Sequence, residues 1–108
     1  MDQTWKTLEA LEALLESRKS ADPATSYVAK LYAKGGKKIA QKVGEEAVEA
    51  AMAVAADDNN ELVAESADLL FHLMLLLKAR GLSLSDVTDE LGRRQGLSGL
   101  DEKARRES

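Results

Sequence analysis

The chain has 108 residues, 44% of them hydrophobic, and a formal net charge of −4 at pH 7. A chain of this length has room for one domain with a small core, so two folded domains are not expected. The acidic balance argues against a general nucleic-acid binder, which usually carries a basic surface, and the absence of cysteine excludes disulfides, thiolate zinc sites and cysteine nucleophiles.

The composition favours helices. Alanine, leucine, glutamate and lysine are frequent, whereas the chain has only one tryptophan, two tyrosines, one phenylalanine and one proline, so we expect an all-α fold. The N-terminus lacks a basic region followed by an apolar stretch. The longest apolar run, residues 69–77, is interrupted by His72 and is too short to span a bilayer. We therefore expect a cytoplasmic protein that binds neither membrane nor nucleic acid.

The first part of the chain predicts two amphipathic helices. The first should cover residues 4–19 with Thr4 as its cap, and its apolar face has helical spacing: Trp5, Leu8, Leu11 and Leu15. Ser26 should cap a short second helix with Tyr27 and Leu31 turned inward, and the glycine pair at 35–36 should end it.

Two longer helices should follow as an antiparallel pair. The third is expected over residues 37–56, with a buried stripe of mostly small residues: Ile39, Ala40, Val43, Ala47, Ala50, Ala51 and Val54. Residues 57–60 are expected to form a turn and to cap the fourth helix. That helix should cover residues 61–80, and Gly81 should end it.

Residues 69–77 of the fourth helix are apolar on every face. One small chain does not easily enclose such a helix, so a second subunit is its simplest cover and we expect a homodimer. Ser83 and Asp86 resemble a capping box for a short fifth helix, so residues 1–95 should form the single domain. The remainder, residues 96–108, should be a partly flexible tail.

Two matched carboxylate pairs are the most informative feature of the chain. Glu46 and Glu49 form E-x-x-E on the third helix, and Glu65 and Asp68 form E-x-x-D on the fourth. Spacing i, i+3 places both members of a pair on one helix face. Antiparallel packing of the two helices could bring the four acids to one point, where a hard cation such as Mg²⁺ or Mn²⁺ would offset their repulsion.

Each acid also has an ordinary explanation. Glu45 and Glu49 could pair with lysines on their own helix, and Glu61 and Glu65 could complement the dipole at the start of the fourth helix. Asp68 is harder to dismiss, because it precedes the apolar run and a buried acid needs a partner. His72, one turn further on, could be a metal ligand, a donor to a ligand, or a core residue, and the last two are favoured.

A cationic stretch precedes the first carboxylate pair. Residues 30–42 contain five lysines in an otherwise acidic chain: Lys30, Lys34, Lys37, Lys38 and Lys42. Local positive charge within a negative protein favours a small polyanion as the ligand over a long one. Magnesium in enzymes commonly bridges protein carboxylates and substrate phosphates, so the lysines and the acids are consistent with one site.

The sequence resembles a known family at these residues. Residues 42–49, KVGEEAVE, followed by ESAD at 65–68, match the E-E-x-x-E and E-x-x-D signature of the MazG-like all-α nucleotide pyrophosphohydrolases. Further blocks resemble the phosphoribosyl-ATP pyrophosphatase branch of histidine biosynthesis: SYVAKL at 26–31, IAQKVG at 39–44, DLLFHL at 68–73, RGLSL at 80–84 and SGL at 98–100. The resemblance extends over about residues 5–103.

The resemblance implies a MazG-like bundle of about five helices, its core completed by dimerisation. It also implies Mg²⁺-dependent hydrolysis of phosphoribosyl-ATP between its α and β phosphates, giving phosphoribosyl-AMP and pyrophosphate, by a stand-alone enzyme. By the same resemblance the metal ligands are Glu46, Glu49, Glu65 and Asp68. Glu45 is expected to support a ligand or activate water, so that the catalytic set is Glu45, Glu46 and Glu49. The triphosphate should be held by Lys30, Lys34 and Lys42.

Three other functions compete with this interpretation. A carboxylate-bridged di-iron bundle needs Glu-x-x-His on two helices, and no glutamate here is followed three residues later by histidine. A non-catalytic dimerisation bundle would leave the acids as surface charge. A house-cleaning pyrophosphatase for noncanonical nucleotides would share the metal site and differ in its base and sugar contacts.

Overall fold

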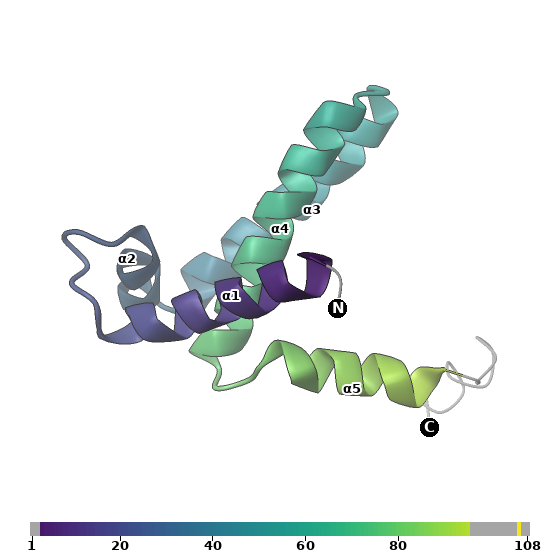
Figure 1. Cartoon of the computed structure of the whole chain (residues 1–108). Coiled ribbons are helices and arrows are strands. Elements are labelled where there is room, and N and C mark those ends of the chain that lie inside the picture. Colours follow the sequence, from purple (N-terminus) through teal and green to yellow (C-terminus); the bar gives the residue numbers. More distant parts are fainter. Residues whose placement is uncertain (1–2, 96–105, 107–108) are drawn as a thin grey trace.

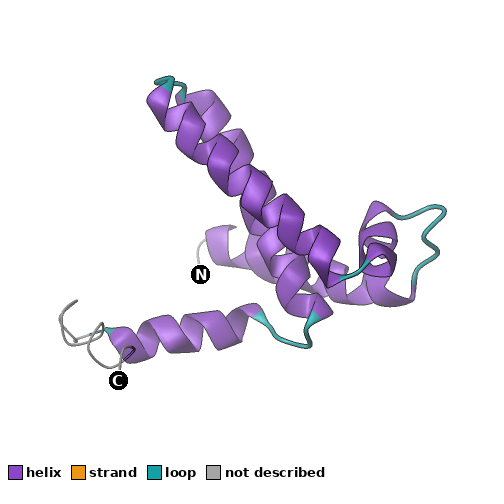
Figure 2. Ribbon diagram, turned by 180° about the vertical axis from the view of Figure 1, so that it is seen from behind, coloured by secondary structure: helices purple, strands orange, loops and turns teal. Residues whose placement is uncertain are grey.

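The computed structural model describes residues 3–95 and residue 106, and it confirms the all-α fold (Figures 1 and 2). Residues 3–95 form five α-helices and one short 3-10 turn, Arg18–Ser20, with no strand among them. The helices are α1 (Gln3–Ser17), α2 (Tyr27–Lys34), α3 (Gly36–Ala55), α4 (Asn59–Ala79) and α5 (Leu84–Arg94). The boundary predicted between a domain at 1–95 and a tail at 96–108 stays a prediction, because residues 96–105 and 107–108 lie outside the described part.

Local sequence signals explain most of the helix ends. The Ser26 side chain accepts a hydrogen bond from the Ala29 backbone N–H at 3.1 Å, as predicted for the cap of α2. Gly35 has φ +94° between α2 and α3, and Gly81 has φ +75° after α4, so both occupy backbone conformations that favour glycine. The Ser83 backbone N–H donates to Asp86 at 2.9 Å, which confirms the capping box of α5.

Two predicted helix starts are displaced. Thr4 lies inside α1 and does not cap it, because the helix already includes Gln3, a good helix former. The helix α4 starts before residue 61, because the Asp58 side chain accepts from the Glu61 backbone N–H at 3.0 Å. The tight turn itself is at Asp57, whose φ is +56°.

The core lies where four helices meet. The helices α3 and α4 form a long antiparallel hairpin, and Figure 1 shows α1 crossing its base while α2 packs beside α3. The fully buried side chains come from all four of these helices, with aromatic and leucine side chains packed around them. This core consists of Leu15, Val28, Leu31, Ile39, Met74 and Leu75.

The helix α5 contributes no buried residue; its Leu84 packs against the core while partly buried, and polar contacts join it to α1. The Glu12 carboxylate accepts a hydrogen bond from the Leu84 backbone N–H at 2.6 Å. Lys78 Nζ lies 3.8 Å from Glu12 and 3.5 Å from Glu16, so the ends of α1, α4 and α5 share one charge cluster.

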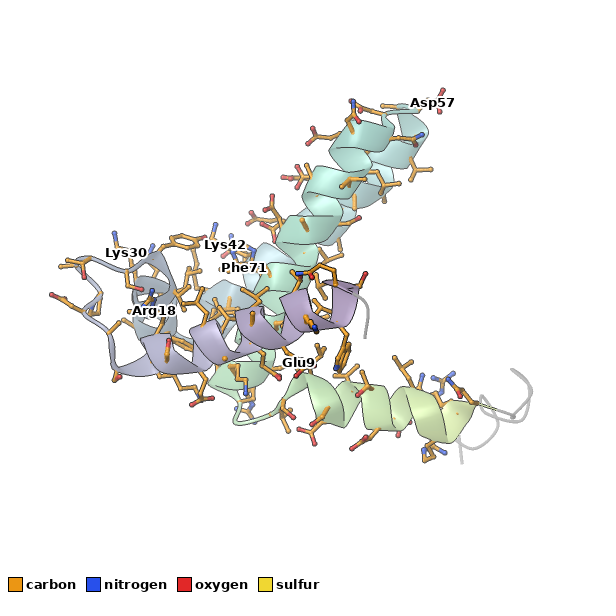
Figure 3. All side chains as sticks on the ribbon, in the orientation of Figure 1. Glu9, Arg18, Lys30, Lys42, Asp57 and Phe71 are labelled. Carbon is orange, nitrogen blue, oxygen red and sulfur yellow. The ribbon has the colours of Figure 1, made fainter. Side chains whose placement is uncertain are left out.

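The far half of the hairpin projects beyond the other helices, with Asp57 at its tip (Figure 3). Large apolar side chains are exposed there, among them Met52 at 64% and Val63 at 69%. The buried stripe predicted for α3 was therefore partly wrong: Ala40, Ala47, Ala51 and Val54 are exposed. Small apolar residues occur on both faces of α3, so their hydrophobicity does not identify the inward one.

In the single chain residues 69–77 are only partly buried, so their cover by a second subunit stays a prediction. Met74 and Leu75 are buried, but Leu70 is 38% exposed and Leu73 is 37% exposed. Asp68 is exposed too, so it is not the buried acid that the sequence suggested. Among the described residues no helix is long and apolar enough to cross a membrane.

Candidate carboxylate site between α3 and α4

Two glutamates occupy positions along the α3–α4 contact where a helix pair normally carries apolar residues. On α3, a series of buried and partly buried positions recurs with spacings of four and three: Ile39, Val43, Glu46, Ala50 and Ala53. Buried or partly buried positions with the matching spacing on α4 are Leu62, Glu65, Leu69, His72 and Leu76. We call these two series the seam. Such spacing is the knobs-into-holes pattern of an antiparallel pair, so Glu46, Glu65 and His72 are polar groups within a packing stripe.

Glu46 is hydrogen-bonded to His72 across the seam. Glu46 Oε1 lies 2.6 Å from His72 Nδ1, and the two side chains are largely covered. His72 Nδ1 is also 3.0 Å from the Asp68 backbone oxygen, and His72 Nε2 is 3.2 Å from the Tyr27 hydroxyl on α2. His72 is therefore buried and contacts a candidate metal ligand. Of the three roles that the sequence left open, this geometry matches the donor to a ligand.

Three other carboxyl groups gather one turn toward the hairpin tip. Glu65 forms side-chain hydrogen bonds with Glu61 and Glu49, and these bonds, together with desolvation and the neighbouring charges, raise the pKa of Glu65 from 4.5 to about 7. Carboxyl groups share hydrogen bonds only when one of them holds a proton. Glu65 keeps its proton to near neutral pH because the proton is shared in these hydrogen bonds and because a further negative charge would be repelled by its two neighbours. A bound cation would relieve the same repulsion.

A shallow cleft of about 400 Å³ lies beside this cluster. It is lined by acids from both helices and by small or flexible apolar side chains: Glu49, Met52, Ala53, Ala56, Asp58, Glu61 and Glu65. It is open to solvent in the single chain. Acidic and apolar groups thus share one surface on the projecting half of the hairpin.

The predicted four-acid convergence is only partly present. Glu49 and Glu65 meet, Glu46 is one helical turn from Glu49 and is held by His72, and the exposed Asp68 side chain forms no hydrogen bond or ion pair within residues 3–95. In the same part of the chain no three His, Asp or Glu side chains already stand in a metal-binding arrangement. The donors fit a hard cation nonetheless, because all are carboxylate oxygens on adjacent turns.

The lysines predicted to bind phosphate are free of acids. Lys30 and Lys34 on α2 are exposed and Lys42 on α3 is partly covered, and none of the three forms an ion pair in residues 3–95. In Figure 3 Lys30 and Lys42 both lie along the upper edge of the view, Lys30 over α2 and Lys42 beside the base of the hairpin. Glu45 is exposed and accepts a hydrogen bond from Gln41 at 2.8 Å, so it does not pair with Lys42.

Sequence reasoning missed two residues of this site. Glu61 was interpreted only as a charge at the start of a helix, although its i, i+4 spacing to Glu65 places both on one face. Tyr27 was expected to point inward as a core residue, but it is half exposed and its hydroxyl contacts His72. Nothing in the sequence indicates that contact, which joins residues 45 positions apart.

Comparison with known proteins identifies the family. The family model described as phosphoribosyl-ATP pyrophosphohydrolase matches residues 8–95. The chain belongs to this family. Its members are hydrolases that act on a pyrophosphate bond, and the carboxylate seam lies entirely within the matched residues.

Curated relatives agree with this assignment. A phosphoribosyl-ATP pyrophosphatase of Erythrobacter litoralis is 59% identical over 100 residues, covering 93% of this chain and 96% of the relative. One from Rhizorhabdus wittichii is 57% identical over 93% of this chain and 94% of its own. The histidine biosynthesis bifunctional protein HisIE of Photobacterium profundum is 59% identical over 87 residues, which are 81% of this chain but 42% of that protein.

Proposed function

We propose that this protein hydrolyses phosphoribosyl-ATP to phosphoribosyl-AMP and pyrophosphate, with Mg²⁺ as its cofactor and Mn²⁺ as a possible substitute, in cytoplasmic histidine biosynthesis. The observation that supports this most is the placement of acids from both signature motifs along one helix–helix seam, in a chain of this family. Packing alone would favour apolar residues at those positions, so the acids require a chemical reason.

The proposed ligands are Glu46 and Glu49 from α3 with Glu65 and Asp68 from α4. The bound cation would neutralise charge on the phosphates and favour departure of pyrophosphate. Only carboxylate oxygens are offered, which suits Mg²⁺ and Mn²⁺ better than zinc or iron. Asp68 must turn toward Glu49 and Glu65 to complete the set, which side-chain rotation on an adjacent turn allows.

The remaining residues act on substrate and water. The ammonium groups of Lys30, Lys34 and Lys42 bind the oxygens of the triphosphate, and they are available because no acid pairs with them in residues 3–95. The carboxylate of Glu45 accepts a proton from the attacking water. The water oxygen bonds to phosphorus, the bridging P–O bond breaks, and pyrophosphate leaves.

The test is pyrophosphate release from phosphoribosyl-ATP, compared with a panel of canonical and noncanonical nucleoside triphosphates. Glu49→Gln and Asp68→Asn should each lower kcat at least about 100-fold while preserving the helical circular dichroism spectrum, because the amide keeps the shape and loses the anion. Lys42→Ala should raise KM, whereas Lys6→Ala on exposed α1 should not. Full activity in excess EDTA, or preference for a noncanonical nucleotide, would contradict the proposal.

We further propose that the working unit is a homodimer. Exposed apolar side chains run along the projecting half of the hairpin and continue at Leu70 and Leu73, and α5 exposes Leu91. A second copy packed against the hairpin would cover them and enclose the shallow carboxylate cleft.

A further inference from the structure

The hydrogen bonds of His72 form a chain that starts at a tyrosine and ends at a candidate metal ligand. His72 is only 6% exposed, and a buried imidazole needs partners for both ring nitrogens. Both have them: Nδ1 faces Glu46 Oε1 and the Asp68 carbonyl oxygen, and Nε2 faces the Tyr27 hydroxyl. No polar atom of this buried side chain is left unsatisfied.

The partners determine which nitrogen of His72 carries the proton. A carbonyl oxygen can only accept, so Nδ1 must donate to Asp68 O and to Glu46 Oε1. The unprotonated Nε2 then accepts from the Tyr27 hydroxyl. The two oxygens at Nδ1 thus select the tautomer that donates to Glu46, and the Tyr27 hydroxyl supplies the donor that this tautomer requires at Nε2.

Aromatic packing fixes the plane of the His72 ring. Phe71 meets it edge to face, with ring centroids 5.0 Å apart and an interplanar angle of 89°. Tyr27 stacks on Phe71 at 6.5 Å between centroids, so the hydroxyl and the imidazole are held by one cluster. Because the donor is fixed, the carboxylate that accepts from it is fixed too.

Glu46 is consequently held by one oxygen and available through the other. Oε1 is bound to His72, whereas Oε2 has no hydrogen bond to any described residue. A carboxylate oriented in this way loses little rotational freedom when a cation binds its second oxygen.

We propose that Tyr27 and His72 are positioning residues that orient Glu46 for the divalent cation. The inference rests on the proposed metal site and adds to it a hydrogen-bonded support that reaches from α2 through α4 to α3. It assigns a function to the buried histidine and to the half-exposed tyrosine hydroxyl, which the hydrolytic step itself does not use.

The experiment measures Mn²⁺ affinity of the metal-free protein by electron paramagnetic resonance, with no substrate present. His72→Leu removes the donor and should weaken Mn²⁺ binding by about 10- to 100-fold, the usual effect of losing a hydrogen bond that orients a ligand. Tyr27→Phe removes only the hydroxyl and should weaken binding by about fivefold, the worth of one neutral hydrogen bond. His72→Asn places an amide donor near the position of Nδ1 and should restore most of the affinity lost in His72→Leu.

Tyr32→Phe is the matched control. It deletes the same atom from the neighbouring tyrosine of α2, whose hydroxyl donates to the Leu15 carbonyl oxygen at 2.9 Å and not to His72. This variant should lose stability and keep wild-type Mn²⁺ affinity. The comparison separates an effect on the ligand from general loosening of α2.

The proposal is overturned if Tyr27→Phe and His72→Leu both bind Mn²⁺ as tightly as wild type, or more tightly. Tighter binding would mean that His72 withholds Glu46 from the cation. If His72→Leu does not fold, the Mn²⁺ affinity of Tyr27→Phe alone tests the proposal. That variant should fold, because residue 27 keeps the aromatic ring that stacks on Phe71. A wild type that binds no Mn²⁺ would overturn the proposed metal site together with this inference, whereas equal affinities with a binding wild type overturn this inference alone.

Discussion

At the scale of single residues, Glu46 and Glu65 occupy positions that packing alone would give to apolar side chains. A buried or half-buried carboxylate costs stability unless it is paired, and the two acids meet this cost differently. Glu46 accepts a hydrogen bond from His72, whereas Glu65 shares protons with other acids. The Glu65 environment is therefore the one in which charge is least compensated.

Replacing Glu65 with Gln should stabilise the metal-free protein. The pKa of Glu65 is raised by its hydrogen bonds to Glu61 and Glu49, so ionisation above about pH 7 opposes folding. At pH 8 in EDTA, the Tm of Glu65→Gln should therefore be a few degrees higher than that of the wild type. The difference should be modest because solvent screens the charges at this site. Metal affinity should fall at the same time.

Glu9→Gln is the control for this change. Glu9 is exposed on α1, at the opposite end of the hairpin from its tip at Asp57 (Figure 3), and its loss alters the net charge equally. Its Tm and metal affinity should match the wild type. A drop in Tm for Glu65→Gln would show that Glu65 forms a stabilising contact in the absence of metal.

A second residue-scale prediction concerns Tyr32, which ties α2 to the end of α1. Tyr32→Phe should lower the free energy of unfolding by about 1 kcal/mol, because one partly buried hydrogen bond is lost. Burial, and secondarily the Glu16 charge, raise the pKa of Tyr32 from 10.0 to about 12. The folded protein thus holds this proton more tightly than the unfolded chain.

This pKa shift gives the effect of Tyr32 a pH dependence. Its contribution to stability is complete below pH 10 and is lost as the pH rises to about 12. Urea unfolding of wild type and Tyr32→Phe should therefore differ at pH 8 and converge toward pH 12. A constant difference across that range would contradict the assignment.

At the scale of helices, glycine ends α4 for a conformational reason. Gly81 has φ +75°, and the Leu82 N–H donates to the Leu77 carbonyl oxygen at 2.8 Å. Gly81→Ala should lower stability by about 1 kcal/mol, because alanine is strained at positive φ. Gly92→Ala inside α5 should raise stability by up to about 1 kcal/mol, since a helix interior prefers alanine. A Cβ added at either glycine would meet no atom within 4 Å, so neither substitution causes a steric clash. The Tm values of the two variants therefore report the backbone effect of each substitution.

Sequence reasoning predicted which helices exist better than which faces they bury. The caps at Ser26 and Ser83 and the stop at Gly81 are local signals, so they could be predicted from adjacent residues. The buried face of α3 could not be predicted in this way. Ala40 and Ala50 are equally apolar, but Ala40 is exposed and Ala50 is buried, and only the position of the partner helix distinguishes them. The paired acids of the two motifs were likewise found by spacing, whereas Glu61 was not assigned to the site and the Tyr27 contact depends on how α2 packs.

At the scale of the whole molecule, the projecting hairpin has too little cover of its own. Its base is held by α1 and α2, but its outer half has only one helix packed against another (Figure 1). Two isolated helices are a marginal structure in water when their outer apolar side chains stay exposed. The carboxylate cleft lies on this half, so a second chain would support the hairpin and the site together.

Sedimentation should therefore show a homodimer at micromolar concentration. Val63→Lys should weaken association strongly, because it places a charge on the projecting face without disturbing the core of one chain. Leu14→Lys makes the same kind of change at an exposed position of α1 and should leave the dimer intact. Leu75→Lys should unfold the protein, since that leucine is fully buried. A wild type that sediments as a compact, stable single chain would refute the dimer, and Val63→Lys would then behave like Leu14→Lys.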